Sequence, residues 1–207
     1  MNIMIISSLI ILLIYLIFTA VKYGVGDYVS DNFYISKNKW IFSSVMAFTA
    51  VSLIVPMIEK NENIILTAHV NPDGDAVGSG LGLFLTLKEN YKDKNIRFVL
   101  QDSIPYTTKF LKGSEEIEKY NSEEKYSTDL LIFLDSATRE RTGETGKNIE
   151  AKLSINIDHH MSNPSYGDVN CVITYSSSTS EIVYHFIKYM GYPISLATAE
   201  ALYLGLV

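Results

Sequence analysis

The amino-acid sequence predicts an α/β fold, a doubly wound and mostly parallel sheet, preceded by a two-helix transmembrane hairpin. Two observations predict the sheet: short apolar runs alternate with helical stretches from Asn63 onward, and the apolar runs end near polar residues. A third observation predicts the hairpin, because two long uncharged runs precede the alternating region. We therefore expect a two-span membrane hairpin over residues 1–56 and a second domain over residues 57–207.

The first apolar run, Ile3 to Val21, has no charged residue before Lys22 and approaches the about 20 residues that cross a bilayer as a helix. The second run, Trp40 to Val55, is also uncharged and begins with an aromatic residue typical of a membrane interface. A soluble amphipathic helix is the alternative for the second run, although it has few polar residues, namely Ser43, Ser44, Thr49 and Ser52.

The strands of the second domain are expected where short apolar runs lie between polar residues. These runs are Ile64 to Ala68, Asn95 to Leu100, Asp129 to Leu134 and Leu153 to Ile157. A helix is expected between the first two runs, over Gly78 to Glu89, where leucines and Phe84 supply an apolar face.

Two more helices are expected near the carboxyl end of the sequence. Ser178 and Glu181 have the spacing of a capping box, which predicts a helix that runs to about Met190 and stops at Gly191. Ser195 then introduces a last helix toward Leu206.

Composition narrows the class of partners. The formal net charge is −6 and only three arginines occur, so a broad cationic surface for long duplex nucleic acid is not expected. The single cysteine, Cys171, cannot form an internal disulfide. The acidic runs Glu115 to Glu118 and Glu123 to Glu124 are typical of a solvated surface.

Polar clusters follow three of the predicted strands, and the carboxyl ends of parallel strands meet at one edge of a sheet. Each cluster alone has an ordinary explanation, as a helix cap or a surface histidine pair. Together they bring three histidines and four carboxylates to one crevice, where the carboxylates would repel one another unless cations were bound. The clusters are His69 to Asp75, Asp135, and Asp158 to His160.

The donor types narrow the choice of metal. Imidazoles and carboxylates without a thiolate suit Mn²⁺, with Mg²⁺, Co²⁺ or Zn²⁺ as alternatives. This many donors predicts two ions, which can share a carboxylate and a water. Asp135 is the candidate that bridges them.

Four segments carry a resemblance to a known family. They are HVNPDGDAVGS at 69–79, LIFLDSA at 131–137, IDHH at 157–160 and SSTSEIVY at 177–184. Residues 58–207 resemble the DHH phosphoesterase superfamily, and the first segment is most similar to bifunctional oligoribonucleases that also act on 3′-phosphoadenosine 5′-phosphate. The resemblance implies hydrolysis of short oligoribonucleotides, of that nucleotide, or of both, with two Mn²⁺ ions as cofactors.

The resemblance also implies roles for individual residues. One ion would be held by His69, Asp73 and Asp135, and the other by Asp75, Asp135 and His159. His160 would face the scissile phosphate, and Asp158 would orient the imidazoles, so Asp135, His160 and Asp158 form the expected catalytic set. Ser178 and Thr179, at a helix start, would contact a phosphate, with plain helix capping as the alternative.

In the family a further metal-binding Asp lies in a Thr-Asp-Thr-Gly-like segment, followed by a smaller substrate-binding domain. Neither follows Val207 in this sequence, so we expect a domain that is truncated at its carboxyl end. We expect such a fragment to bind Mn²⁺ poorly and to hydrolyse little.

Alternatives remain open at this point. The apolar runs favour an enzyme anchored in the membrane with its catalytic domain in the cytoplasm, whereas Lys22, Lys37 and Lys39 favour the opposite orientation. If Met57 is a separate start, the enzyme is cytoplasmic. Two other functions are a membrane-anchored cyclic-dinucleotide phosphodiesterase and an inactive membrane protein that retains a phosphoesterase remnant.

Overall fold

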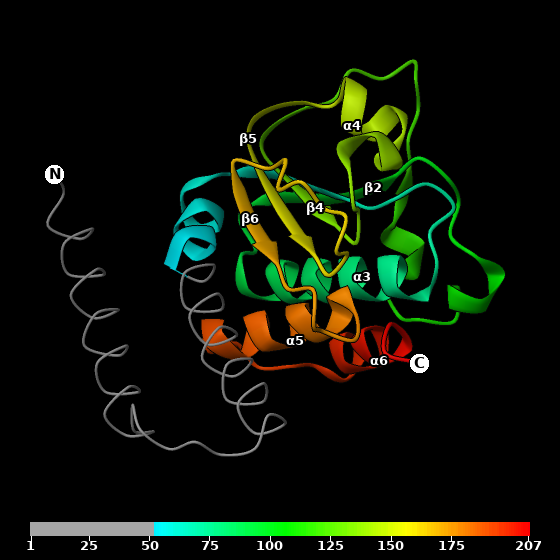
Figure 1. Ribbon diagram of the computed structural model, residues 1–207, viewed down its shortest axis with the longest axis vertical. Helices are drawn as coiled ribbons and strands as arrows, with labels where there is room; N and C mark the ends of the chain where they lie inside the picture. The colour runs from blue at the N-terminus through cyan, green and yellow to red at the C-terminus, as the bar shows by residue number, and fades with distance from the viewer. Residues whose placement is uncertain (1–51) are drawn as a thin grey trace, which may run out of the picture.

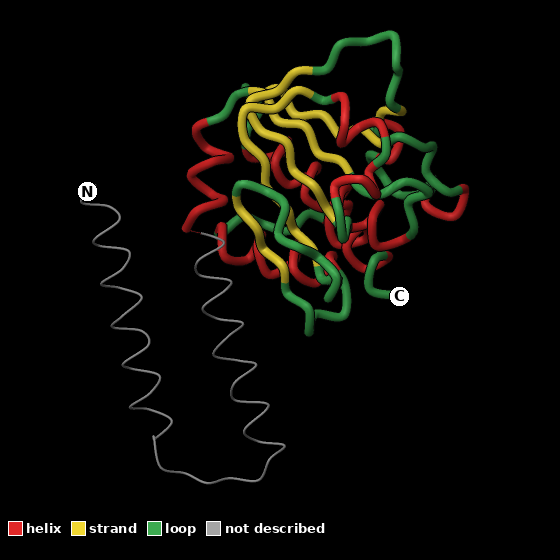
Figure 2. Tube along the Cα trace, turned by 45° about the horizontal axis from the view of Figure 1, so that its top comes forward, coloured by secondary structure: helices red, strands yellow, loops and turns green. Residues whose placement is uncertain are grey.

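A six-stranded parallel sheet forms the centre of the computed structural model, which describes residues 52–207 (Figure 1, Figure 2). The strands are β1 (Asn63–Thr67), β2 (Asn95–Leu100), β3 (Glu118–Lys119), β4 (Ser127–Leu134), β5 (Glu150–Asp158) and β6 (Val169–Val172). Their order across the sheet is β3-β2-β1-β4-β5-β6, and all neighbours are parallel. This confirms the predicted α/β class and the four predicted strands, to within three residues at each end.

The helices lie on both faces of this sheet. They are α3 (Gly74–Asn90), α4 (Glu144–Asn148), α5 (Thr179–Met190) and α6 (Leu196–Leu204), with 3₁₀ turns η1 (Tyr106–Thr108), η2 (Ser114–Glu116) and η3 (Arg139–Thr142). The chain passes from β1 to β2 through α3 and from β4 to β5 through α4. These crossovers run outward in opposite directions from the centre, so right-handed connections place α3 and α4 on opposite faces.

The two faces are covered unequally. Figure 1 shows α5 and α6 beside α3 on one side of the sheet, where the larger hydrophobic core includes Phe84 and Phe98. The opposite face has only the short α4 and a smaller cluster that includes Phe133 and Tyr126. The sheet is therefore wound in both directions, but one layer of long helices supplies most of the buried apolar surface.

Helix α3 begins four residues before the predicted Gly78. The Asp73 carboxylate accepts hydrogen bonds from the backbone N–H groups of Asp75 and Ala76, at 3.0 Å each, and so caps the helix. Gly74 to Gly78, at the start of the helix, include few apolar side chains, so apolar spacing does not indicate where the helix begins. The cap places Asp73 and Asp75 at the amino end of α3, after the loop that follows β1.

Residues 1–51, which hold most of the predicted membrane hairpin, lie outside the described residues. Within residues 52–207, no helix is both long enough and apolar enough to cross a membrane. Residues 52–60 are helical and continue through the predicted domain boundary at 56. Ile54 and Ile58 of this helix are buried in the larger core, so residues on both sides of that boundary pack in the same domain.

Candidate metal centre

The candidate centre lies where the strand order reverses. In a doubly wound sheet, strands that leave in opposite directions open a crevice at their carboxyl ends, and ligands bind there. β1 and β4 are the neighbours at this point. His69 follows β1, Asp135 follows β4 directly, and Asp158 ends β5. The structure therefore brings together the three clusters that the sequence places at strand ends.

One group of possible ligands consists of His69, Asp73 and Asp135. His69 Nε2 lies 3.7 Å from Asp73 Oδ1 and 3.5 Å from Asp135 Oδ2. The other ring nitrogen, Nδ1, lies 2.8 Å from the carbonyl oxygen of Val70. A proton on Nδ1 would be donated to this carbonyl, which leaves Nε2 directed at the two carboxylates.

A second group consists of Asp135, His159 and His160. Asp135 Oδ1 lies 3.6 Å from His159 Nε2 and 3.8 Å from His160 Nδ1. Since the His69 side of the site faces the other oxygen, Oδ2, the Asp135 carboxylate presents one oxygen to each group. That arrangement is what a carboxylate shared by two ions requires.

Asp75 lies beside the second group without being part of it. Its Oδ2 is 3.8 Å from His159 Nε2. The two oxygens of Asp75 accept hydrogen bonds from the backbone N–H groups of Thr179 and Ser180, at 2.8 and 2.9 Å. The positive end of α5 thus stabilises this half-buried carboxylate.

His160 and Asp158 form a separate contact at the edge of the site. His160 Nδ1 lies 2.7 Å from Asp158 Oδ1, and Asn163 donates to Asp158 Oδ2 at 2.6 Å. Asp158 is completely buried, whereas the His160 side chain is 30% exposed. This geometry fixes the orientation of the His160 ring and leaves its Nε2 as the nitrogen that Asp158 does not engage. No pattern in the sequence indicates the contact between Asn163 and Asp158.

Asp135 has an unusual backbone conformation. Its φ is +50°, a region that residues other than glycine adopt at a cost. Its backbone N–H donates to the carbonyl of Ile157 at 3.1 Å, and its side chain is almost fully buried. This strain at the end of β4 holds the carboxylate between the two histidine groups.

The crowded carboxylates alter the proton affinities of their neighbours. Hydrogen bonds to Asp135 and Asp73 raise the pKa of His69 to about 10. The same contact with His69 lowers the pKa of Asp73 well below its usual range. Burial and the negative charge of Asp135 raise the pKa of Asp75 to about 6, although hydrogen bonds from Ser180 and Thr179 oppose the change. Concentrated negative charge therefore dominates the site.

The start of α5 has the predicted cap at Ser178. Ser178 Oγ accepts from Glu181 N–H at 3.1 Å, so Ser178 is the helix cap. Glu181 returns to Ser177 N–H at 2.7 Å, one residue earlier than a capping box requires. Because the N–H groups of Thr179 and Ser180 already bind Asp75, this helix end holds a carboxylate, and contact with a phosphate stays a prediction.

These donors fit a divalent cation. Donors around an octahedral ion with bonds near 2.1 Å lie about 3 Å apart. Asp135 lies 3.5 Å from His69 Nε2 and 3.6 Å from His159 Nε2, so small movements of the side chains would complete the coordination. The nitrogen and carboxylate donors lack a thiolate, which suits Mn²⁺ or Mg²⁺.

Two curated relatives share this half of the molecule. A bifunctional oligoribonuclease and PAP phosphatase, NrnA, from Bacillus subtilis (strain 168) is 36% identical over 157 residues, which are 74% of this chain and 48% of the relative. The protein of the same name from Thermus thermophilus is 36% identical over 129 residues, 62% of this chain and 37% of the relative. The chain thus spans about half, or less, of the length of these relatives.

A solved structure supports the fold. An exopolyphosphatase-related protein from Bacteroides fragilis superimposes with a TM-score of 0.70 at 29% sequence identity, covering 76% of this chain and 49% of that protein. In addition, residues 63–206 match the sequence family described as the DHH family, N-terminal domain. That match extends over well more than half of the chain, and the chain therefore belongs to the DHH family.

Proposed function

We propose that this chain provides the cation centre of a phosphoesterase that acts on short oligoribonucleotides, on 3′-phosphoadenosine 5′-phosphate, or on both. The observation that carries the proposal is the position of Asp135, which presents one oxygen to His69 and the other to His159 and His160. The activities for which the NrnA relatives from Bacillus and Thermus are named supply the substrate classes.

Charge explains why the proposed centre depends on cations. Four aspartates surround the place where a substrate phosphate would bind, and without positive charge they would repel it. Two bound divalent ions would supply Lewis-acid stabilisation of the phosphoryl oxygens and an activated water. We assign Mn²⁺ to the site, with Mg²⁺ or Co²⁺ as alternatives, from the mixed nitrogen and oxygen donors.

The protein's own residues would position the substrate. His160 is oriented by its contact with the buried Asp158. Its partly exposed ring can therefore contact a phosphoryl oxygen with little further loss of rotational entropy. Asn163 holds the second oxygen of Asp158 and keeps that carboxylate from turning toward the substrate. Asp75, fixed by the start of α5, completes the wall beside His159.

The test is a hydrolysis assay of the full chain with Mn²⁺ on diadenylate, 3′-phosphoadenosine 5′-phosphate and a cyclic dinucleotide. We expect slow turnover of at least one of the first two, still less of the cyclic substrate, and loss of all turnover in EDTA. Asp135→Asn should reduce turnover by at least about a hundredfold, since it removes a charge shared by both groups. Unchanged turnover by Asp135→Asn would contradict the assignment of Asp135 to the centre. A preference for the cyclic dinucleotide would contradict the proposed substrates and indicate a cyclic-dinucleotide phosphodiesterase.

A further inference from the structure

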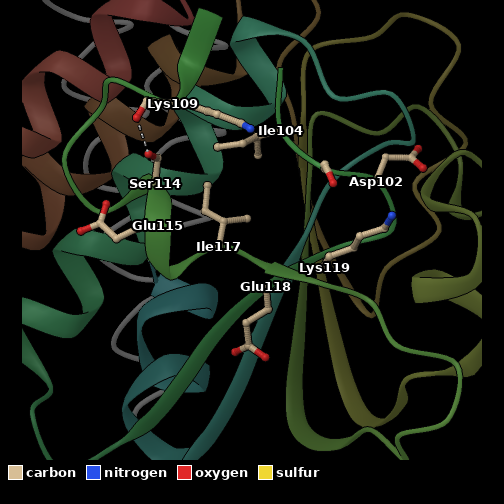
Figure 3. Close-up of a pocket in the computed structure, with 9 residues that line it drawn as sticks. Asp102, Ile104, Lys109, Ser114, Glu115, Ile117, Glu118 and Lys119 are labelled. Atoms are coloured by element: carbon tan, nitrogen blue, oxygen red, sulfur yellow. Dashed lines mark hydrogen bonds between the residues drawn. The ribbon is translucent and has the colours of Figure 1, made fainter. Parts of the chain in front are cut away.

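A separate pocket with a volume of about 350 Å³ lies beyond the carboxyl end of β2, next to β3 (Figure 3). Ile104 and Ile117 contribute apolar surface to its interior, and both are half-buried. Lys109 and Lys119 belong to its wall and are exposed. The pocket therefore combines an apolar surface with two cationic side chains.

The carboxylates in the wall already have partners. Asp102 Oδ2 accepts from the backbone N–H of Asn71 at 2.8 Å, and Glu115 accepts from Gly113 N–H at 3.0 Å. Glu118 forms an ion pair with Arg97, whose Nε donates to Glu118 Oε1 at 2.9 Å. Each acid is thus held by a donor of the protein.

Unlike the acids of the pocket, which each accept a hydrogen bond, its two lysines have no charged partner among the described residues. Neither the Lys109 nor the Lys119 ammonium forms an ion pair with any residue in the range 52–207. In Figure 3, Ile104 is drawn next to the end of Lys109, and Lys119 is drawn next to Asp102. An anionic ligand with a flat apolar part would gain both contacts, and a nucleotide, with its phosphate and its base, has this chemistry.

The segment that supplies Lys109 has a further feature of nucleotide-binding surfaces. Tyr106 and Phe110 are 88% and 73% exposed, although large aromatic side chains usually lose most of their exposure on folding. Exposed aromatic rings beside cationic groups are the usual means by which proteins stack the bases of single strands.

The pocket is joined to the candidate metal centre by one hydrogen bond. Asn71, which donates to Asp102, lies midway between His69 and Asp73 in the sequence and has a φ of +51°. The strands of a sheet are about 4.8 Å apart, so β3 lies about 10 Å from β1. A strand of a few nucleotides with one phosphate at the centre can span this distance. Diadenylate has only one phosphate, the scissile one, so it offers no further phosphate to the lysines of the pocket.

We propose that this pocket is a second nucleotide subsite, which binds the phosphate and base of a nucleotide distant from the scissile bond. The inference rests on the proposed function and extends it, because it makes the enzyme prefer oligonucleotides over dinucleotides. Lys109 and Lys119 contact the phosphate, and the surface of Ile104 and Ile117 receives the base.

The test uses the full chain and the double variant Lys109→Met/Lys119→Met, which keeps side-chain length and removes both charges. The matched control is Lys60→Met/Lys92→Met, because these exposed lysines precede β1 and β2 at the opposite end of the sheet. Binding of fluorescein-labelled pentaadenylate is measured by anisotropy in EDTA, where no turnover is needed. KM for pentaadenylate and for diadenylate is measured with Mn²⁺.

We expect the pocket variant to bind pentaadenylate about tenfold more weakly. The slope of the logarithm of affinity against the logarithm of salt concentration should become shallower by about 1.4, since each single-strand phosphate contact contributes about 0.7. KM should rise for pentaadenylate and stay constant for diadenylate, and the control should match the parent. The subsite would be overturned by a pocket variant that binds pentaadenylate as tightly as the parent, or by an equal loss of affinity in the control variant. Equal changes in KM for pentaadenylate and diadenylate would also overturn it. If the parent chain cleaves neither substrate, the proposed function fails, while the anisotropy result still decides the subsite.

Discussion

Thr179 connects two carboxylates of the candidate centre. Its hydroxyl donates to Asp135 Oδ1 at 3.0 Å, and its backbone N–H donates to Asp75 Oδ2 at 2.8 Å. The residue is completely buried, so these hydrogen bonds form away from water and are strong. We infer that Thr179 positions the acids for a cation, a role different from the phosphate contact that the sequence suggests.

Substitution of Thr179 separates this role from a purely structural one. Thr179→Val removes the hydroxyl and retains the backbone N–H, and we expect Mn²⁺ affinity to fall about tenfold or more, as for other residues that orient metal ligands. Thr179→Ser should restore most of the affinity, because it restores the donor. The measurement is Mn²⁺ titration by calorimetry.

The control for Thr179→Val is Thr86→Val. Thr86 is another buried threonine, and its hydroxyl donates to the carbonyl of Gly82 within α3 at 2.9 Å. Its replacement should change stability and leave Mn²⁺ affinity unaltered. Equal affinities for Thr179→Val and Thr179→Ser would show that the hydroxyl does not position a ligand.

The proton affinities of His69 and Asp75 predict how metal binding depends on pH. His69, with a pKa of about 10, carries a proton at neutral pH that its ring nitrogen must release to bind a cation. Asp75, with a pKa of about 6, adds a second competing proton only in more acidic solution. Affinity should therefore rise about tenfold per pH unit above pH 6 and more steeply below it.

Mn²⁺ dissociation constants at a series of pH values between about 5 and 8 would check this dependence. Calorimetry in buffers with different ionisation enthalpies would count the released protons directly, and we expect close to one at neutral pH. An affinity that stays constant across this range would contradict the assigned ligands.

At the scale of elements, the packing of α3 against α6 sets the position of the acidic loop. A Cβ atom at Gly78 would lie 2.5 Å from the Ala201 carbonyl oxygen and 2.9 Å from Gly205 N. Because both are backbone atoms, the helices cannot yield by turning a side chain. Glycine thus permits the close approach that holds the amino end of α3, with Asp75, beside α5.

We expect Gly78→Ala to destabilise the protein by about 1 to 3 kcal/mol, as in other overpacked interiors. Gly74→Ala is the control in the same helix, because its Cβ would meet Leu204 O at an ordinary 3.4 Å. That change should be neutral or stabilising, since alanine favours helices over glycine. Urea unfolding measures both, and equal stabilities would contradict the close packing.

The sequence predicted elements whose signal is local. The bounds of β2 follow from a short run that is apolar except for Asn95 and Arg97, and the start of α5 follows from the Ser178 cap. β3, with the residues Glu118 and Lys119, has no apolar pattern, and only pairing with the edge of β2 makes it a strand. β6 is also short and contains Asn170, so its pairing with β5 could not be read from spacing.

The candidate site shows the same division. Residues that end strands, such as His69 and Asp135, could be predicted because parallel strands share one edge. The contact between Thr179 and Asp135 spans 44 residues and depends on how α5 packs against the sheet. That Lys109 and Lys119 form no ion pair within residues 52–207 likewise becomes evident only when the partners of the nearby acids are known.

At the scale of the whole molecule, the strand order explains how a chain with a net charge of −6 can serve anionic substrates. The reversal between β1 and β4 concentrates the acids at one point, where cations would invert the local charge. The lysine-containing pocket lies farther along the same edge. Cleavage and the binding of the remaining strand would thus be separated along one edge of the sheet.

In our proposal, Asp135 organises a cation centre at the point between β1 and β4 where the strand order reverses. The most direct measurement is titration of the full chain with Mn²⁺, following the free ion by electron paramagnetic resonance. We predict that the parent chain depletes free Mn²⁺ and that Asp135→Asn, which retains the size and the tolerance for positive φ, depletes far less. Equal depletion by the two proteins, or none by the parent at millimolar Mn²⁺, would contradict a cation centre organised by Asp135.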